Sequence, residues 1–433
     1  MLALVRIALR NLLLHRERGL LLFGIIASAT AVLVGMMALK TGVATAQREA
    51  VTTFLSGDLN VGGFFKVHPD TIAPVIGDIG RVRGVVEPLV PAGCGLRERG
   101  RDRVIAGAGR HRTRSYVTSL DVARERESFR LFKVKEGALD GLERPRTVAL
   151  STQLAARLRV KVGDVATLFS KTVGDKRNAL DVEVVAITDR AGVLGETSGI
   201  VVSNATLREL GGYRPEAAGV LQLTCALSAP ELDALGGRLR EALRQADFEV
   251  LPAAHEAYAD KLAPLLREGW SGQRLDVTTW QDESVFLSFV TDGLGALTVL
   301  LGLVVLAVIM VGLFVALNVA VRERTREIGT LRAMGMHRTS VVGMFLLEGL
   351  LLGLLASATG ACAAVALCTL LQEAVTLPEA VSSLFFSGTL PLQPSLGEVV
   401  FAVFLITLGS ALASLVPAAR AASLSPRSAM ESL

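Results

Sequence analysis

The chain has 433 residues, of which 51% are hydrophobic and 20% charged, and its mean hydropathy is +0.48. This value excludes an ordinary soluble domain, so part of the chain must lie in lipid. The net charge of +4 could suit a nucleic-acid partner, but most of the basic excess lies in short loops beside apolar segments. Membrane orientation explains such loops, so no nucleic-acid partner is expected.

The polar residues do not indicate catalysis or metal binding. The five histidines are scattered, and no G-x-S-x-G, H-E-x-x-H or paired Cys/His pattern occurs. We therefore expect no enzymatic activity, metal or cofactor in this chain. Cys362 and Cys368 fall in an apolar run, whereas Cys94 and Cys225 fall in the charged region. The sequence alone does not decide whether Cys94 and Cys225 form a disulfide, and we do not expect one.

Four apolar stretches are long enough to cross a bilayer, which requires about 20 helical residues. They cover residues 20–39, 293–321, 349–372 with a lead-in from 339, and 399–419. The first is longer than the apolar core of a secretory signal, and no cleavage site of small residues follows it. We therefore interpret it as a membrane anchor.

The distribution of arginine predicts the orientation of these spans. Four arginines precede the first span and five lie in the loop 322–338, whereas residues 372–396 contain neither Lys nor Arg. Because short basic loops stay in the cytoplasm, we expect both termini to be cytoplasmic. Residues 40–285 then lie outside the cytoplasm.

The predicted fold class is an α-helical membrane protein with four transmembrane helices and a large α+β extracytoplasmic domain inserted between helices 1 and 2. The expected segments are a cytoplasmic interfacial helix (1–19), span one (20–39), an extracytoplasmic β-rich subdomain (40–215), an extracytoplasmic α+β subdomain (216–285), span two with a stalk (286–321), a cytoplasmic coupling helix (322–338), span three (339–372), an extracytoplasmic loop (373–395), span four (396–419) and a cytoplasmic tail (420–433).

Short β-branched runs between Gly, Asp and Asn residues predict strands in the first subdomain. The second subdomain is expected to form a strand at 220–226, a helix at 230–246 and a strand at 248–251, with Pro230 in the first helical turn. The uncharged part of span two would be about 43 Å long, more than a bilayer needs. We expect the excess to form a stalk.

The loop after span two predicts a short amphipathic helix on the cytoplasmic face. Ile328, Leu331 and Met334 recur at helical spacing, and Gly335 is the expected stop. The residues expected to contact a cytoplasmic partner are Arg326, Glu327, Ile328, Gly329, Leu331, Arg332, Met334 and Gly335.

Three motifs resemble those of one permease group. R-E-I-G-T-L-R-A-M-G-M (326–336), followed by F-L-L-E-G-L-L-L-G-L-L, is similar to the permease signature of the FtsX, MacB and LolC/LolE group of ABC transporters. Trp280-Gln281-Asp282 resembles the tryptophan motif at the start of the stalk, and residues 416–426 resemble the closing P-A-x-x-A-A-x-x-x-P pattern. The segment Val148–Leu168, with its L-A-x-x-L-x-V-x-V-G-D run, resembles the periplasmic domain of the same group.

This resemblance implies a mechanotransmission permease of type VII, working as a dimer with a second copy or a paralogue. A cytoplasmic ABC ATPase would bind ATP and Mg, because the sequence contains no G-x-x-x-x-G-K-[ST] loop. Only about 19 residues precede span one, so we expect that ATPase to be a separate polypeptide.

Span three carries a predicted packing surface. Gly349, Gly353 and Ser357 recur every four residues on one face, which allows close helix approach within the membrane or in a dimer. Glu348 is the one acidic residue within this span. It could have a functional role, or a structural role in which its carboxylate reaches the cytoplasmic arginines. We favour the structural role.

Three functions remain open. The leading hypothesis is a Lol-type lipoprotein-releasing permease, with a periplasmic lipoprotein chaperone or adaptor and membrane lipid as further partners. The hairpin 170–179 is short and polar where LolC-like subunits have a longer chaperone-binding loop. The alternatives are a MacB-like exporter of peptides or antibiotics, and FtsX-like force transmission to a periplasmic hydrolase without transport. The substrate and the homodimeric or heterodimeric state cannot be read from the sequence.

Overall fold

The computed structural model describes residues 16–68, 71–126, 129, 132–189, 199–257, 260–378, 381–382, 385 and 387–423. The predicted interfacial helix (1–19) and cytoplasmic tail (420–433) fall mostly outside these ranges. The described chain divides into a membrane unit (residues 16–44, 290–377 and 389–423) and a sheet unit (residues 45–289 and 378–388). We treat each unit by itself.

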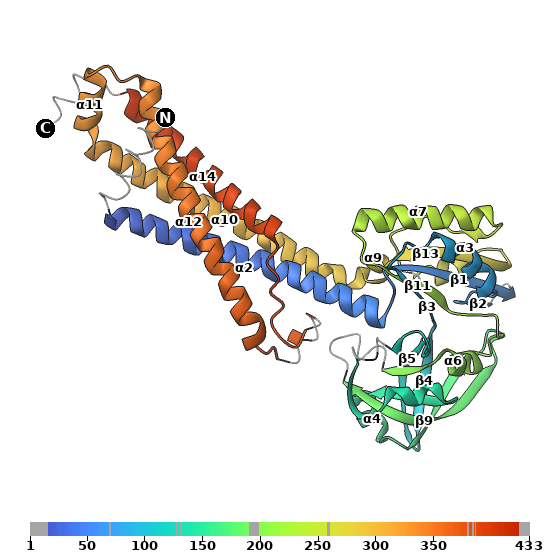
Figure 1. The fold of residues 1–433 in the computed structure, drawn as a ribbon. Coiled ribbons are helices and arrows are strands. Elements are labelled where there is room, and N and C mark those ends of the chain that lie inside the picture. The colour runs from blue at the N-terminus through green and yellow to red at the C-terminus, as the bar shows by residue number, and fades with distance from the viewer. Residues whose placement is uncertain are drawn as a thin grey trace. The chain divides into compact units, whose positions relative to one another are not determined.

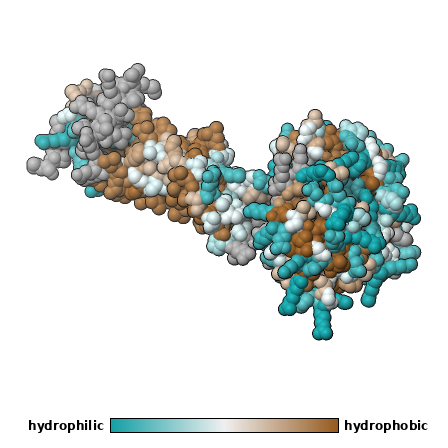
Figure 2. Space-filling view, turned by 60° about the horizontal axis from the view of Figure 1, so that its bottom comes forward, coloured by the Kyte–Doolittle hydropathy of each residue, from teal (hydrophilic) through white to brown (hydrophobic). Residues whose placement is uncertain are grey.

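Four long helices build the membrane unit (Figure 1). They are α2 (Arg16–Phe54), α10 (Val285–Glu323), α12 (Arg338–Ala374) and α14 (Leu396–Ser423), with the short α11 (Thr325–Ala333) between α10 and α12. All four are long and apolar enough to span a membrane. Hydrophobic residues cover their outer surface in Figure 2, which is typical of helices that face lipid.

Each helix extends beyond the predicted span. The difference is largest for α2, which continues 15 residues past residue 39 and ends at Phe54, inside the sheet unit. Lys40 marks the end of the apolar run and the charged Arg48 and Glu49 follow it, but charged residues do not stop a helix. Hydropathy therefore located the span and not the end of the helix.

The sheet unit contains two sheets. The first, six-stranded, has the order β12-β13-β1-β11-β3, with β2 also pairing with β1. Its elements are β1 (Leu59–His68), β2 (Thr71–Ala73), α3 (Ile79–Val86), η1 (Glu87–Leu89), β3 (Gly95–Arg99), β11 (Val220–Thr224), α7 (Ala229–Gln245), β12 (Glu249–Val250), α8 (Leu262–Arg267), β13 (Gly272–Thr279) and α9 (Trp280–Glu283). Helices α3 and α7 bury the apolar face of this sheet in one core.

The second sheet has seven strands in the order β6-β9-β7-β10-β5-β4-β8. Pairing of β8 with β9 closes six of them into a barrel. Its elements are β4 (Arg101–Ala108), β5 (His111–Leu120), β6 (Lys133–Gly137), η3 (Leu139–Glu143), β7 (Thr147–Ser151), α4 (Thr152–Leu158), β8 (Val165–Lys171), β9 (Arg177–Asp189), β10 (Ile200–Ser203) and α6 (Asn204–Gly211). Alternate side chains such as Val104, Leu168 and Leu180 fill the interior.

The topology corrects the predicted division at residues 215/216. Strands β1 and β3 come from the beginning of the domain and β11 and β13 from its end, yet all four belong to the six-stranded sheet. The barrel is therefore an insertion between β3 and β11. Non-local antiparallel pairing decides this arrangement, and no local sequence pattern reports it.

Cys94 and Cys225 form a disulfide, a pairing that the sequence left open and did not lead us to expect. They lie 131 residues apart, next to the paired strands β3 and β11. The register Thr224↔Gly95 brings the two cysteines together across the barrel insertion. Their sequence spacing carries no such information.

The C-terminal end of α2 is held by two buried arginines of β3. The guanidinium of Arg97 donates to the carbonyls of Thr52 and Ser56, the latter over 2.9 Å, and Arg99 Nη1 donates to the carbonyl of Thr53 over 2.6 Å. The last carbonyls of a helix lack intrahelical partners and carry partial negative charge. The arginines satisfy these carbonyls where water is excluded.

Glu125 balances the two buried charges. Its carboxylate forms ion pairs with Arg99 and, at 3.5 Å, with Arg97, and it also accepts the backbone N–H of Asp121 over 3.0 Å. Burial, followed by the nearby charge of Arg99, lowers the pKa of Arg97 to about 9, although the negative charges of Glu125 and Asp58 oppose the shift. The anchoring of α2 therefore depends on one buried acid.

Replacement of Glu125 tests this dependence. Glu125→Gln removes the carboxylate that forms ion pairs with both buried guanidinium groups. We therefore expect the local opening free energy of β3 and of the end of α2 to fall by about 3–5 kcal/mol. Amide hydrogen exchange of the full chain measures this loss. Glu143→Gln, which breaks the exposed pair with Arg126, is the matched control and should change stability by about 1 kcal/mol at most. Equal protection in both variants contradicts the assignment.

Candidate functional site

The loop between α10 and α12 forms the predicted short helix. Helix α11 covers Thr325–Ala333, and Gly335 follows in a left-handed conformation with φ of 98°. Its N–H donates to the carbonyl of Arg332 over 3.1 Å. Glycine adopts this conformation without strain, which confirms Gly335 as the stop.

The inner face of α11 is part of the membrane unit. The side chain of Ile328 is 2% exposed and packs in the core that contains Val341 and Phe345. Gly329 is also buried. The side chain of Leu331 is not among those that the structure describes. Ile328 is thus placed as an anchor of α11, which corrects its predicted role as a contact for a cytoplasmic partner.

Two arginines attach α11 to neighbouring helices. Arg324, at the start of α11, lies with Nη1 3.6 Å from the Oε2 of Glu348 on α12. Arg332 Nη1 donates to the carbonyl of Ala422 on α14 over 3.1 Å. A displacement of α11 would therefore act on α12 and α14 directly.

The outer face of α11 is polar and accessible. Arg326, Glu327 and Thr330 are exposed, and the side chain of Met334 is 76% exposed just after the helix. An exposed methionine beside charged side chains is typical of contact surfaces for other proteins. Of the predicted contact residues, Arg326, Glu327 and Met334 are therefore accessible to a partner, and Thr330, which was not predicted, lies beside them.

The small-residue face of span three packs within the chain. A methyl group added to Gly353 would lie 2.6 Å from Ser410 Cβ on α14, and one added to Gly349 would lie 3.0 Å from Ser414. The hydroxyls of Ser357 and Thr407 lie 3.4 Å apart. This face thus packs α12 against α14. A contact of the same face with a second permease subunit stays a prediction.

In the sheet unit, Trp280 lies where two helices meet the sheet. It is the first residue of α9, which precedes α10, and it packs beside Val51 and Leu287. Its backbone N–H donates to the carbonyl of Asp58 over 3.1 Å. The start of α10 and the end of α2 therefore meet at the beginning of β1.

Asp58 connects these elements. Its carboxylate pairs with Arg48 of α2 at 2.7 Å and accepts the backbone N–H of Cys225 over 2.8 Å. The guanidinium of Arg48 also lies 5.9 Å from the ring centroid of Trp280. This contact set joins α2, β1, β11 and α9 next to the Cys94–Cys225 disulfide.

Sequence reasoning missed Asp58, Arg97, Arg99, Arg324 and Glu125 as functional candidates. Their charge made them resemble solvated surface residues, and their partners lie far away in the sequence. Only Arg324 could have been identified from the sequence, because it lies in the arginine-rich loop 322–338 that contains the permease motif. Among the described residues, no group of His, Cys, Asp and Glu side chains is arranged to hold a metal ion.

Comparison with known proteins identifies the membrane part. Residues 299–426, from α10 through α14, match the family described as FtsX-like permease C-terminal. No curated protein matches the chain.

Three solved structures are similar to parts of this chain, all at low identity. The extracellular domain of the noncanonic ABC-type transporter YknZ from Gram-positive bacteria has 14% identity and a TM-score of 0.29, covering 43% of this chain and 92% of that one. The periplasmic region of MacB from Actinobacillus actinomycetemcomitans has 9% identity and a TM-score of 0.31, covering 55% and 95%. A domain of a putative permease from Porphyromonas gingivalis has 11% identity and a TM-score of 0.25, covering 42% and 83%.

These structural scores are too low to support an argument, so the assignment depends on the family match. That match includes α11, the arginine-rich loop and the small-residue face of α12, which are the features that carried the resemblance in the sequence. Residues 299–426 of this chain form an FtsX-like permease C-terminal domain, which confirms the family resemblance drawn from its motifs.

Proposed function

We propose that this chain is the permease subunit of an ATP-driven ABC complex and that α11 receives movement from a cytoplasmic ATPase. The observation that carries the proposal is the attachment of α11 to two long helices through Arg324–Glu348 and Arg332–Ala422. Its buried Ile328 holds the helix in place while its polar face stays accessible. A partner that pushes on this face moves the bundle with it.

The proposed location is the bacterial inner membrane, with both termini in the cytoplasm and the sheet unit outside. The arginine-rich loop 322–338 and the Lys- and Arg-free segment 372–396 support this orientation. The Cys94–Cys225 disulfide supports it independently, because disulfides persist in oxidising compartments.

Cysteine labelling tests the orientation. In a chain lacking its four native cysteines, we expect Gly388→Cys to react with an impermeant maleimide in intact spheroplasts. Thr330→Cys, on the exposed face of α11, should react only after the membrane is opened. Labelling of Thr330→Cys from outside would reverse the orientation and remove the proposed ATPase contact.

The long helices offer a path for movement. Helices α2 and α10 each contain 39 residues, which corresponds to about 58 Å against a hydrocarbon thickness of about 30 Å. The end of α2 is bound by Arg97 and Arg99, and the start of α10 follows Trp280. Movement along either helix would thus act on the sheet unit, and this step requires no catalytic reaction in this chain.

ATP hydrolysis is assigned to a separate subunit. The sequence lacks a phosphate-binding G-x-x-x-x-G-K-[ST] loop, so ATP and Mg would bind to the ATPase. Arg326, Glu327, Thr330 and Met334 form the proposed contact face.

Charge reversal tests this contact. Glu327→Lys should lower recovery of the ATPase with the permease by about tenfold or more, because like charges at an interface cost several kcal/mol. Glu373→Lys, an exposed acid at the other end of α12, is the control and should leave recovery unchanged. Copurification from membranes measures both. Normal recovery with normal ATP turnover in Glu327→Lys would contradict the proposed face.

We further propose lipoproteins of the inner membrane as the substrate. The outer surfaces of α10 and α14 expose large apolar side chains, including Leu303, Val311 and Phe404. A lipid-anchored substrate or a second permease subunit could contact this surface within the bilayer. A periplasmic lipoprotein chaperone or an adaptor would then accept the released substrate.

Reconstitution tests the substrate. Proteoliposomes with this chain, its second permease subunit and its ATPase should release a lipoprotein into the soluble fraction only during ATP hydrolysis. The Glu327→Lys complex should release none. Export of a peptide or antibiotic instead would favour the MacB-like alternative. Activation of a periplasmic hydrolase without any release would favour force transmission alone.

A further inference from the structure

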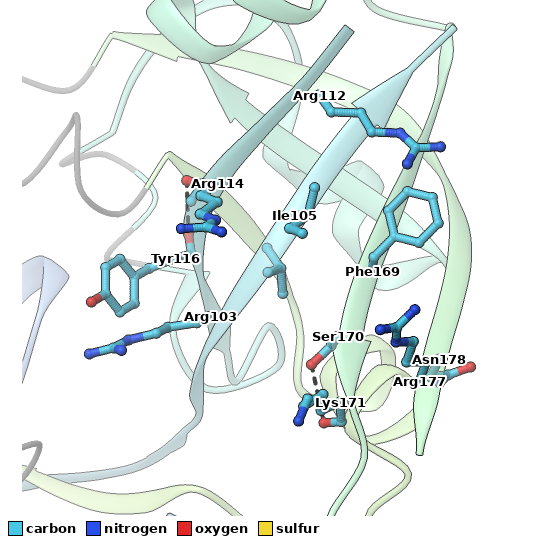
Figure 3. A pocket seen from close by; sticks show the side chains of 12 residues that line it. Arg103, Ile105, Arg112, Arg114, Tyr116, Phe169, Ser170, Lys171, Arg177 and Asn178 are labelled. Carbon is cyan, nitrogen blue, oxygen red and sulfur yellow. Dashed lines mark hydrogen bonds between the residues drawn. The ribbon is translucent and has the colours of Figure 1, made fainter. Parts of the chain in front are cut away.

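The outside of the barrel carries a basic cleft with no assigned function. It has a volume of about 940 Å³, and its basic lining residues are Arg103, Arg112, Arg114, Lys171 and Arg177. Figure 3 shows these side chains around Ile105 and Phe169, with Tyr116 beside Arg103. No carboxylate is among the described residues that line the cleft.

Strand register explains how these residues converge. Cross-strand pairs place Arg103 opposite Tyr116, Ile105 opposite both Arg114 and Phe169, and Lys171 opposite Arg177. Paired residues share one face of a sheet, so strands β5, β4, β8 and β9 all project side chains into the same space. Their neighbours Val104, Leu168 and Leu180 point into the barrel core.

The charge of the cleft is unusual for this domain. Elsewhere on the barrel, Arg126, Arg144 and Arg146 pair with Glu143, Glu183 and Glu209. Within the described ranges, no carboxylate forms an ion pair with Arg103, Arg112, Arg114 or Arg177, whereas Lys171 pairs with Asp175 at 2.7 Å. Four guanidinium groups therefore remain available to an anion in one concave site.

Aromatic rings orient two of these groups. The guanidinium of Arg112 lies 5.2 Å from the centroid of Phe169, and that of Arg103 lies 5.5 Å from Tyr116. Gly107 faces Arg112, and a methyl group there would lie 3.3 Å from the Phe169 ring and 3.5 Å from Arg112 Cγ. The missing side chain leaves room for the stacked arrangement, which holds a planar donor in one orientation.

We propose that this cleft binds a small ligand carrying at least two phosphoryl groups, such as a phosphorylated sugar or a lipid headgroup. Arginine forks bind phosphate oxygens in pairs, and cations on opposite sides of one concavity suit a compact polyanion. The volume lies in the range of small-molecule sites. An acidic peptide would need carboxylates spaced along a line, which fits the ring of cations less well. This inference goes beyond the proposed function and requires no ATPase.

Binding to the full chain, reconstituted in phosphatidylcholine nanodiscs without free detergent, tests the proposal. The soluble probe is glucose 1,6-bisphosphate, and the lipid probe is phosphatidylcholine vesicles with and without cardiolipin. Arg112→Gln with Arg114→Gln should weaken binding roughly a hundredfold, because each charge-assisted contact contributes about a tenfold factor. Arg144→Gln with Arg146→Gln removes the same charge from exposed paired sites and should have little effect.

A third variant separates a built site from diffuse charge. Phe169→Leu retains every cation but removes the ring beneath Arg112, so affinity should fall while net charge is unchanged. Binding of the bisphosphate supports a soluble ligand, and binding of cardiolipin vesicles alone supports a lipid headgroup. An alternating Glu-Leu peptide is a third probe and tests the acidic-peptide alternative. The proposal is overturned if neither phosphoryl probe binds or if only this peptide binds. It is also overturned if both arginine double variants lose equal affinity or if Phe169→Leu binds normally.

Discussion

Two arginines of β3 bind the last carbonyls of α2, and the anchoring of this long helix in the sheet unit depends on that interaction. A helix end buried without partners would leave several carbonyls unsatisfied. Arg97 and Arg99 remove that cost, but they introduce two buried charges that Glu125 must balance. Asp58 adds a second attachment one turn earlier through Arg48. The end of α2 is therefore fixed by directional contacts as well as by apolar packing.

The membrane unit uses a similar arrangement around α11. Ile328 supplies apolar burial, while Arg324 and Arg332 supply contacts to α12 and α14. Because both contacts are made by long side chains to groups on other helices, α11 is attached to the bundle without being continuous with it. Its polar face remains accessible for the same reason, since the contacts use only the opposite side of the helix.

The disulfide and the close packing of α12 against α14 serve different parts of the chain. The Cys94–Cys225 disulfide links two parts of the six-stranded sheet across the barrel insertion. A disulfide lowers the conformational entropy of the unfolded chain, and this effect grows with the length of the loop that it closes. Gly349 and Gly353 allow α12 and α14 to approach closely, and in lipid such packing is a main source of helix association. Both features stabilise the elements that carry the proposed movement.

The sequence by itself was enough to predict the four apolar helices and the family resemblance of residues 299–426. Long apolar runs, arginine asymmetry and the R-E-I-G-T-L-R motif are local or compositional signals, so the four spans, the short helix and its stop at Gly335 could be predicted. Several strands and α7 could be predicted as well, because β-branched runs and a Pro-marked helix start are local patterns.

Only the tertiary structure decided which distant residues meet. The barrel interrupts the first sheet, Cys94 reaches Cys225, and Glu125 reaches Arg97 and Arg99 through strand pairing rather than spacing. The same holds for the inward position of Ile328, because an amphipathic pattern shows that a helix has an apolar face but not what covers it. Whether a charged residue is buried or exposed was the hardest feature to predict. An arginine or glutamate that is buried with a partner has the same identity in the sequence as one that is exposed to water.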